Sequence, residues 1–380
     1  MAGIRDWFEL GRATIRSLKS SDVSDLYALE WPAAIDQLTA DHRGAIDREP
    51  KAYKRLIRTN SAVMYGLAKR LSPIRRLLFV LANGAFIISV LGILTRAGVK
   101  FWIWDSLLCS FFLLTLLLGM ELIDKLKFRD ELELARELQA GLIPKTLPQF
   151  EGFELGAFNA IANTVGGDIY DFVPLCDGRL AILFGDASGH GMTAGLVMAV
   201  AHAAFRTQLE IDPSPPAIMG ALNRILCRTG SRRSFFSSCY LIVGPDGSFD
   251  ATLAGHPQII RVDAAGRVVD RIGLGSYPLG IKPGLLWQSI SGILASGESL
   301  VLHSDGLTEA RNGAGQDLGD DYLESVIGWF PGASAPELVE SIVAEWRGFT
   351  ERRPPEDDVS VAVIRSTGRQ AGIPEVLTLR

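Results

Sequence analysis

Residues 179–199 read RLAILFGDASGHGMTAGLVMA, and the fold can be worked out from this stretch outward. The apolar run from Leu180 to Phe184 predicts a buried strand, and that strand ends at Asp186. The turn ASGHG follows, and a long apolar helix is predicted from Met192. A carboxylate is therefore expected at the end of a buried strand, beside a glycine-rich turn.

Similar patterns continue through the second half of the chain. Short apolar runs predict further strands at SSCYLIVG, ESLVLHSD and DVSVAVIR. Helices are predicted at MTAGLVMAVAHAAFRTQLE, PPAIMGALNRIL and SAPELVESIVAEW, and Ser334 and Glu337 give the last one the spacing of a capping box. Two helices follow the first strand and several strands then follow in a row. This grouping favours an α+β domain with a largely antiparallel sheet.

Carboxylates stand at strand ends or beside glycines in four separate segments: Asp168 and Asp171, Asp186, Asp305, and Asp357 with Asp358. Any one of them alone is readily explained as a turn former. If they converge, their mutual repulsion requires cations between them, and oxygen-only ligands suit Mg²⁺ or Mn²⁺. Two such ions can activate a water and neutralise a phosphoryl group.

Length, charge and cysteine content limit the number of domains, the kinds of partner and the redox compartment. The 380 residues are enough for two ordinary domains, and a net charge of −5 does not indicate nucleic-acid binding. The four cysteines lie far apart without a CxxC pair, which indicates a reduced, cytosolic setting without a disulfide framework or zinc site.

Two apolar segments, 77–95 and 101–120, account for the high mean hydropathy of +0.20. Each approaches the length of about 20 residues that crosses a bilayer. Asp105, the only charge within them, is expected at headgroup depth. The alternative is a buried helical hairpin in a soluble domain.

The short connection RAGVK makes these segments a hairpin, so both flanks must lie on one side. Basic residues concentrate in those flanks: Lys69, Arg70, Arg75, Arg76, Lys125, Lys127 and Arg129. Because such residues favour the cytoplasm, we expect a multi-pass protein of the cytoplasmic (inner) membrane with both termini cytoplasmic. The first 30 residues contain no apolar run typical of a cleaved signal peptide.

The remaining segments divide the chain further. Residues 1–75 are predicted to be a mostly helical, cytoplasmic region, either a small cap or a membrane-surface segment. Residues 121–146 predict a connecting amphipathic helix ended by Pro144, with Leu134, Leu138 and Leu142 on one face. That face is expected either to dock on its own domain or to pair with a second copy of the chain as a homodimer. The globular domain is expected at 147–367, followed by a tail at 368–380.

A family resemblance joins these motifs. In order, the chain contains VGGDIYDF, FGDASGHGMTAGLVMA, LAGHPQIIR, PLGI, LVLHSDGLTEARN and DDVSVAVIR. This series resembles the bacterial metal-dependent serine phosphatases of the PPM family, in particular the SpoIIE/RsbU branch, which is related to the eukaryotic type 2C phosphatases. The resemblance covers about residues 130–366, and LARELQAGLIPKTLP is similar to that branch's entry helix.

The resemblance implies an αββα sandwich with two divalent cations, Mn²⁺ or Mg²⁺, at one edge. It implies that Asp186 bridges both cations, that Ala187 offers its carbonyl, and that Asp168, Asp305 and Asp357 complete the ligands. Asp171 is a weaker candidate, Asp358 is the alternative to Asp357, and Ser360 stands where the family often has Thr.

The resemblance also implies a function. We expect a membrane-anchored protein-serine/threonine phosphatase acting on a phosphorylated regulatory protein of the anti-sigma-factor antagonist type. The alternative is a catalytically degenerate docking protein that binds a phosphorylated partner. A histidine at His190 could act as an acid toward the leaving group, although a structural role is favoured there and at His256. No role is assigned to His42, His202 or His303.

One further motif points elsewhere. The stretch CRTGSRR, 227–233, has the Cys-x-x-Gly-x-x-Arg spacing of cysteine-dependent tyrosine phosphatases. Their loop follows a strand and opens a helix, whose N-terminal amides hold the phosphate. Here a helix is predicted before Cys227 and a strand after it. The negative end of a helix disfavours both thiolate and phosphate, so a cysteine mechanism is not expected. The nearby arginines Arg228, Arg232 and Arg233 are expected to complement that helix end or to touch an acidic substrate protein.

Overall fold

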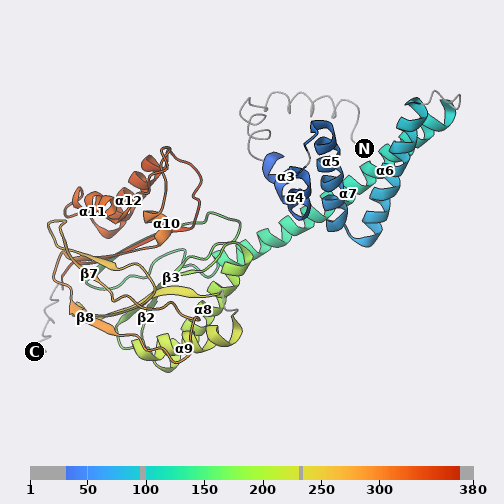
Figure 1. Cartoon of the computed structure of the whole chain (residues 1–380). Coiled ribbons are helices and arrows are strands. Elements are labelled where there is room, and N and C mark those ends of the chain that lie inside the picture. Colours follow the sequence, from blue (N-terminus) through green and yellow to red (C-terminus); the bar gives the residue numbers. More distant parts are fainter. Residues whose placement is uncertain (1–30, 49, 95–99, 231–233, 369–380) are drawn as a thin grey trace, which may run out of the picture. The chain divides into compact units, whose positions relative to one another are not determined.

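The computed structural model describes residues 31–48, 50–94, 100–230 and 234–368 (Figure 1). The chain divides into two compact units, Met1–Lys127 and Phe128–Arg380.

The first unit is helical throughout its described part. Its helices are α3 (Trp31–Thr39), the short 3-10 helix η2 (Ala40–His42), α4 (Arg43–Asp47), α5 (Ala52–Arg70), α6 (Pro73–Leu94) and the first part of α7 (Lys100–Ala140). Helices α3 and α4 pack against α5. Residues 1–30 of the predicted N-terminal region lie outside the described residues.

Helices α6 and α7 run antiparallel and side by side. At one level the guanidinium of Arg75 lies 3.0 Å from Glu121 and 2.6 Å from Asp124. At another level the hydroxyls of Ser89 and Ser106 are hydrogen-bonded. Between these two levels the residue number rises from 75 to 89 in α6 and falls from 121 to 106 in α7, so the two helices are antiparallel. Both helices are long and apolar enough to cross a membrane, judged by length and composition, and most of their apolar residues are exposed. The connecting loop at 95–99 is outside the described residues.

Helix α7 differs from the expected division at residue 120. It is one helix of 41 residues that contains both the second apolar segment and most of the predicted connecting helix, because no glycine pair or proline interrupts it. It ends at Ala140 rather than at Pro144. The N–H of Gly141 bonds the carbonyl of Leu138, which closes the last turn early.

The second unit contains two five-stranded sheets. One has the order β1 (Phe153–Ala160), β10 (Val359–Ser366), β9 (Ser299–His303), β6 (Ile259–Val262) and β7 (Val268–Ile272). The other has the order β2 (Ile169–Pro174), β3 (Leu180–Ala187), β4 (Phe236–Val243), β5 (Ser248–Ala254) and β8 (Ser289–Ile293). All strand pairs within them are antiparallel, which confirms the predicted sheet type.

Helices cover the outer face of each sheet. Helices α8 (Met192–Ile211) and α9 (Pro215–Thr229) pack on the β2–β3 sheet, and α11 (Asp320–Gly328) and α12 (Ala335–Phe349) lie over the other. Alternate residues of β3 serve two cores: Leu183 packs toward α8, whereas Phe184 packs between the sheets. Both strand faces are thus buried, which explains the unbroken apolar runs. The predicted αββα sandwich is confirmed.

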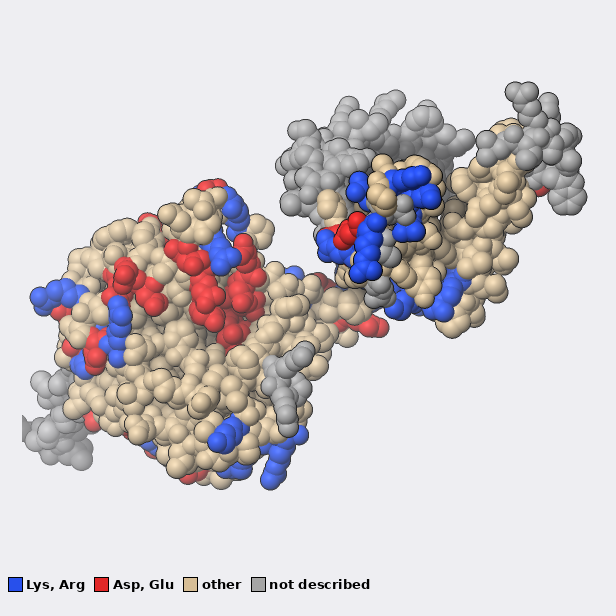
Figure 2. Space-filling model, viewed as in Figure 1, with Lys and Arg blue, Asp and Glu red and all other residues tan. Residues whose placement is uncertain are grey.

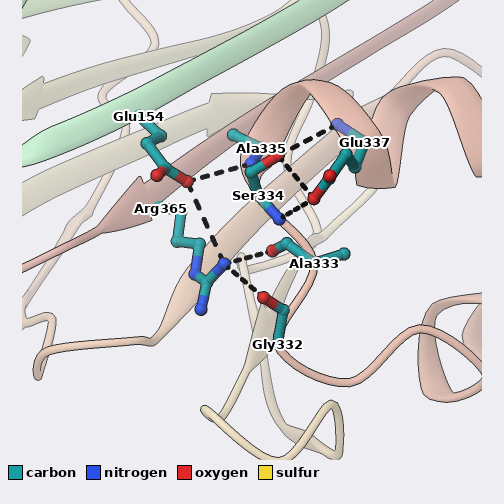
Figure 3. A network of polar contacts seen from close by, with 7 residues as sticks. All are labelled: Glu154, Gly332, Ala333, Ser334, Ala335, Glu337 and Arg365. Atoms are coloured by element: carbon teal, nitrogen blue, oxygen red, sulfur yellow. Dashed lines mark hydrogen bonds and ion pairs between the residues drawn. The ribbon is translucent and has the colours of Figure 1, made fainter.

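The start of α12 is held by the predicted capping box (Figure 3). The hydroxyl of Ser334 accepts the backbone N–H of Glu337 at 3.4 Å, and the Glu337 carboxylate accepts the N–H of Ser334 at 2.9 Å. Glu154 from β1 and Arg365 from β10 bond the neighbouring backbone. The helix is therefore anchored to the two strands on which it packs.

Candidate active site

The acidic residues meet at one end of the sandwich because antiparallel pairing brings the end of one strand beside the start of the next. Asp168 directly precedes β2 and Asp186 lies near the end of β3, where Ile169 pairs with Gly185. In the other sheet, Asp305 opens the short helix α10 (Asp305–Thr308) just after β9, and Asp357 lies just before β10. Figure 2 shows a dense group of Asp and Glu side chains on one face of this unit.

The electrostatics show that these carboxylates are close together. Burial raises the pKa of Asp186 to about 8, and the negative charges of Asp305, Asp357 and Asp358 add to this shift. Burial also raises the pKa of Asp357, with Asp358 and Asp305 contributing in the same direction. The pKa of Asp168 lies well above its usual range, first because of burial and then because of Asp186. At neutral pH Asp186 therefore holds a proton unless a cation replaces it.

Asp168 provides the sharpest test of whether the site suits a cation. Its side chain is almost fully buried, and its Oδ2 has no hydrogen-bond partner among the described residues. A buried carboxylate oxygen without a partner is costly, and this cost is removed if the oxygen binds a metal ion. Asp168 therefore has the position and the free oxygen that a metal ligand needs.

Gly167 leaves space beside two other oxygens of the site. A Cβ atom at Gly167 would lie 2.7 Å from the carbonyl oxygen of Ala187 and 2.8 Å from Oδ1 of Asp186. Only glycine fits between these two oxygens without displacing them. Across the described residues, no three His, Cys, Asp or Glu side chains enclose an ion by themselves. Magnesium-like ions are commonly held by one or two carboxylates and waters, so a set that includes the Ala187 carbonyl fits such an ion.

The structure separates the roles of the two adjacent aspartates. Asp358 is buried, and its oxygens accept the backbone N–H groups of Ala162 at 2.8 Å and Gly167 at 2.5 Å. It thus links the start of β10 to the loop that carries Asp168. Asp357 is exposed toward the cluster and is the better candidate ligand of the two.

Asp171 does not join the cluster. Its buried carboxylate accepts from Nε2 of His202 at 2.8 Å and from the Arg206 guanidinium at 2.6 and 2.9 Å, and both partners lie on α8. These three contacts satisfy its oxygens, so Asp171 is a structural residue. The contact with Asp171 also gives His202 a structural role, which was not expected from the sequence.

The other histidines divide by exposure. His190 is exposed, and it lies close enough to Asp357 to oppose the rise in the pKa of that carboxylate. Nδ1 of His256 donates to the Pro257 carbonyl and its ring packs edge-on against Phe184. Burial lowers the pKa of His256 to about 4, so this ring is neutral and structural at physiological pH.

Gln139 was not identified from the sequence. It lies in the last turn of α7, is 4% exposed, and forms two hydrogen bonds to one residue. Its Nε2 donates to the carbonyl of Gly166 at 2.6 Å, and its Oε1 accepts the N–H of Gly166 at 2.9 Å. The end of α7 is thereby fixed to the loop carrying Asp168. No local pattern marks such a residue, because its partner is 27 positions away.

A cavity of about 300 Å³ opens beside Asp357. Its lining carries charges of both signs, from Glu309, Arg311, Arg353 and Glu356, and an apolar wall that includes Trp346. A chain segment bound there would lie next to the carboxylate cluster.

Cys227 lies outside this cluster. It is inside α9, its thiol donates to the Asn223 side chain at 3.5 Å, and β4 follows. The predicted order of helix and then strand is confirmed, so the residue is not at the N-terminal end of a helix. Arg232 and Arg233 lie outside the described residues.

Comparisons with known proteins agree with this architecture. Residues 176–367 match the family model described as Stage II sporulation protein E (SpoIIE). The chain is 27% identical over 217 residues to the phosphoserine phosphatase RsbU of Bacillus subtilis (strain 168), covering 57% of this chain and 64% of that protein. It is 24% identical over 239 residues to the phosphoserine phosphatase RsbP of the same organism, covering 62% and 57%. The chain thus spans less than two thirds of the length of either relative.

Solved structures share the fold of the second unit. The SiaA-PP2C domain of Pseudomonas aeruginosa superposes with a TM-score of 0.56 at 21% identity, covering 64% of this chain and 98% of that one. The PP2C phosphatase domain of SpoIIE from Bacillus subtilis, solved with a fragment of its regulatory domain, gives a TM-score of 0.50 at 20% identity, covering 56% and 62%.

Proposed function

This chain belongs to the SpoIIE family, and on that premise we propose that it is a membrane-anchored, metal-dependent protein-serine/threonine phosphatase. The observation that carries the proposal is the convergence of carboxylates around the unpartnered, buried Oδ2 of Asp168. The similarity to two phosphoserine phosphatases supports phosphoserine as the group hydrolysed.

The proposed ligand set is Asp168, Asp186, the carbonyl of Ala187, Asp305 and Asp357. When bound there, two divalent cations, Mn²⁺ or Mg²⁺, would activate a water molecule and neutralise the phosphoryl charge. The chain itself supplies the positioning. Asp358 accepts the N–H of Gly167, and Gln139 hydrogen-bonds the N–H and the carbonyl of Gly166. Together these contacts fix the loop that carries Asp168 and so position its carboxylate.

The proposed substrate is a phosphorylated regulatory protein of the anti-sigma-factor antagonist type. Its phosphorylated segment would lie along the cavity beside Asp357. Glu309 and Glu356 line this cavity and could contact a basic group of the segment. Arg311 and Arg353 also line it, and each would have to share its guanidinium between an acidic group of the segment and its present partner, Asp317 or Glu351. The apolar wall at Trp346 gives such a segment a surface for one side chain.

The proposed anchor is the α6–α7 hairpin in the cytoplasmic membrane, with both termini and the phosphatase domain in the cytoplasm. The basic residues at the outer ends of the hairpin support this orientation. Helix α7 also presents Leu134 and Leu138 to solvent, with 59% and 69% of their surface exposed. Pairing of these leucines with a second copy of the chain is part of the proposal.

The test is phosphate release from a phosphoserine protein by the full-length chain in detergent, with Mn²⁺ and then with excess chelator. Turnover that requires Mn²⁺ supports a phosphatase. Stoichiometric binding of the phosphoprotein without turnover, under every metal condition, would favour the docking alternative. Reporters fused to each terminus test the orientation, and a periplasmic C-terminal reporter would refute it.

A further inference from the structure

Helix α5 has an exposed apolar stripe, formed by Tyr53, Leu56, Ile57, Met64 and Leu67. At 3.6 residues per turn, these positions fall within an arc of about 100°, so they share one side of the helix. The exposed fractions of Tyr53, Leu56 and Ile57 are 60%, 71% and 63%. Such a side is unusual on a helix that is otherwise packed, and it calls for an apolar partner.

The neighbouring helix α3 does not cover the stripe. Ala62 is buried, and a Cβ atom at Gly66 would come into contact with the backbone of Leu38 in α3. These two residues lie on the side of α5 opposite the stripe, by the periodicity of the helix. Helix α5 therefore packs against α3 on one side and presents apolar residues on the other.

The charge of this region has one sign. Between residues 51 and 76 the chain contains no Asp or Glu, and its basic residues are Lys51, Lys54, Arg55, Arg58, Lys69, Arg70, Arg75 and Arg76. Figure 2 shows Lys and Arg side chains over the α3–α5 region, with a few Asp or Glu side chains among them, and further Lys and Arg side chains at the base of α6. An apolar side combined with a basic polar side is typical of helices that lie in the interface of an anionic membrane.

The connection to the hairpin gives the stripe a definite place. Only Leu71 and Ser72 separate α5 from α6. The guanidinium of Arg76 donates to the carbonyls of Ala68, Lys69 and Leu71, at 2.9, 3.2 and 3.3 Å, so it fixes the corner between the two helices. The apolar part of α6 begins directly after Arg76. Helix α5 therefore ends two residues before the helix that forms the first proposed membrane span.

We propose that α5 lies in the interface of a bilayer that contains anionic lipid, with its apolar stripe among the upper acyl chains and its basic residues beside the headgroups. The proposal rests on the membrane anchor proposed above. It adds a second attachment of different chemistry, which holds the cytoplasmic region flat against the membrane instead of leaving it free in water.

The test uses the full-length protein reconstituted into vesicles of phosphatidylcholine, with or without phosphatidylglycerol. Cys109, Cys176 and Cys227 are replaced by serine, and the buried Cys239 is kept. A polarity-sensitive fluorophore is then attached through Leu56→Cys on the stripe. The matched control carries it through Ser61→Cys, which is exposed on another side of α5. The readouts are emission wavelength and quenching by acrylamide.

We expect the label at position 56, in vesicles with anionic lipid, to shift its emission to the blue and to lose most of its quenching, and the label at position 61 to change little. Equal quenching at both positions, in protein that floats with the vesicles, would overturn the inference and leave the anchor intact. Protection of position 56 that appears equally in detergent and depends on protein concentration would also overturn it, because a second copy of the chain would then cover the stripe. Protein that does not float with the vesicles would overturn the anchor together with the inference.

Discussion

Cation binding at the carboxylate cluster should release protons. Burial and three neighbouring carboxylates raise the pKa of Asp186 to about 8, and the pKa of Asp168 is raised as well. At pH 7 a group with a pKa of 8 is protonated in about nine of ten molecules. A cation that binds Asp186 must displace that proton, so we expect the release of about one proton per protein.

The same exchange sets the pH dependence of affinity. Displacing one proton makes the observed affinity about tenfold stronger for each pH unit below the pKa, so Mn²⁺ should bind about tenfold more tightly at pH 7 than at pH 6. Titration calorimetry in two buffers of different ionisation enthalpy measures both the affinity and the protons released.

The control is Asp177→Asn, since Asp177 pairs with Arg179 in an exposed turn and should leave both quantities unchanged. Affinity that stays constant from pH 6 to pH 8, with no proton release, would refute the reasoning that the raised pKa values belong to the cation ligands.

Three other predictions follow from the same site. In metal-free protein, the raised pKa of Asp186 contributes stability that is fully present below its ordinary pKa of 3.8 and is lost as the pH rises through about 8. The melting temperature should therefore fall between these two pH values, and it should fall less in Asp186→Asn. Gly167→Ala should abolish Mn²⁺ binding, because its Cβ occupies the space between two ligand oxygens, whereas Gly348→Ala, with nothing within 4 Å, should bind normally. Gln139→Leu leaves the N–H and carbonyl of Gly166 without partners, at a cost of about 1–3 kcal/mol each. We expect it to weaken Mn²⁺ binding at least tenfold, as measured by calorimetry, and unchanged affinity would show that the contact between α7 and the loop does not matter.

Much of the fold could be predicted because its signals are local. The strand from Leu180 is an unbroken apolar run, since both faces of β3 are buried, and the capping box at Ser334 needs only four residues. Helix α7 was divided too early because composition changes at residue 120 while the backbone does not. Its end at Ala140 was placed late because Pro144 was given more weight than Gly141.

The site could be predicted in part. The sequence singled out the carboxylates because each lies at a strand end or beside glycines, but distinguishing among them depends on distant partners. The resemblance implied Asp357 as a ligand, with Asp358 as the alternative. Asp358 accepts the N–H groups of Ala162 and Gly167, which are 196 and 191 residues away in the sequence, and these contacts leave Asp357 as the better candidate. Asp171 differs from Asp168 only through its contacts with α8, which no local pattern shows.

The most direct test of the account compares two single substitutions in the full-length protein. Phosphomonoester hydrolysis is measured with Mn²⁺ and with a chelator for the unchanged chain, for Asp305→Asn and for Cys227→Ser. The account predicts activity that requires Mn²⁺, is abolished by Asp305→Asn and is unchanged by Cys227→Ser. Activity that survives the chelator, or that requires Cys227 and not Asp305, would contradict it.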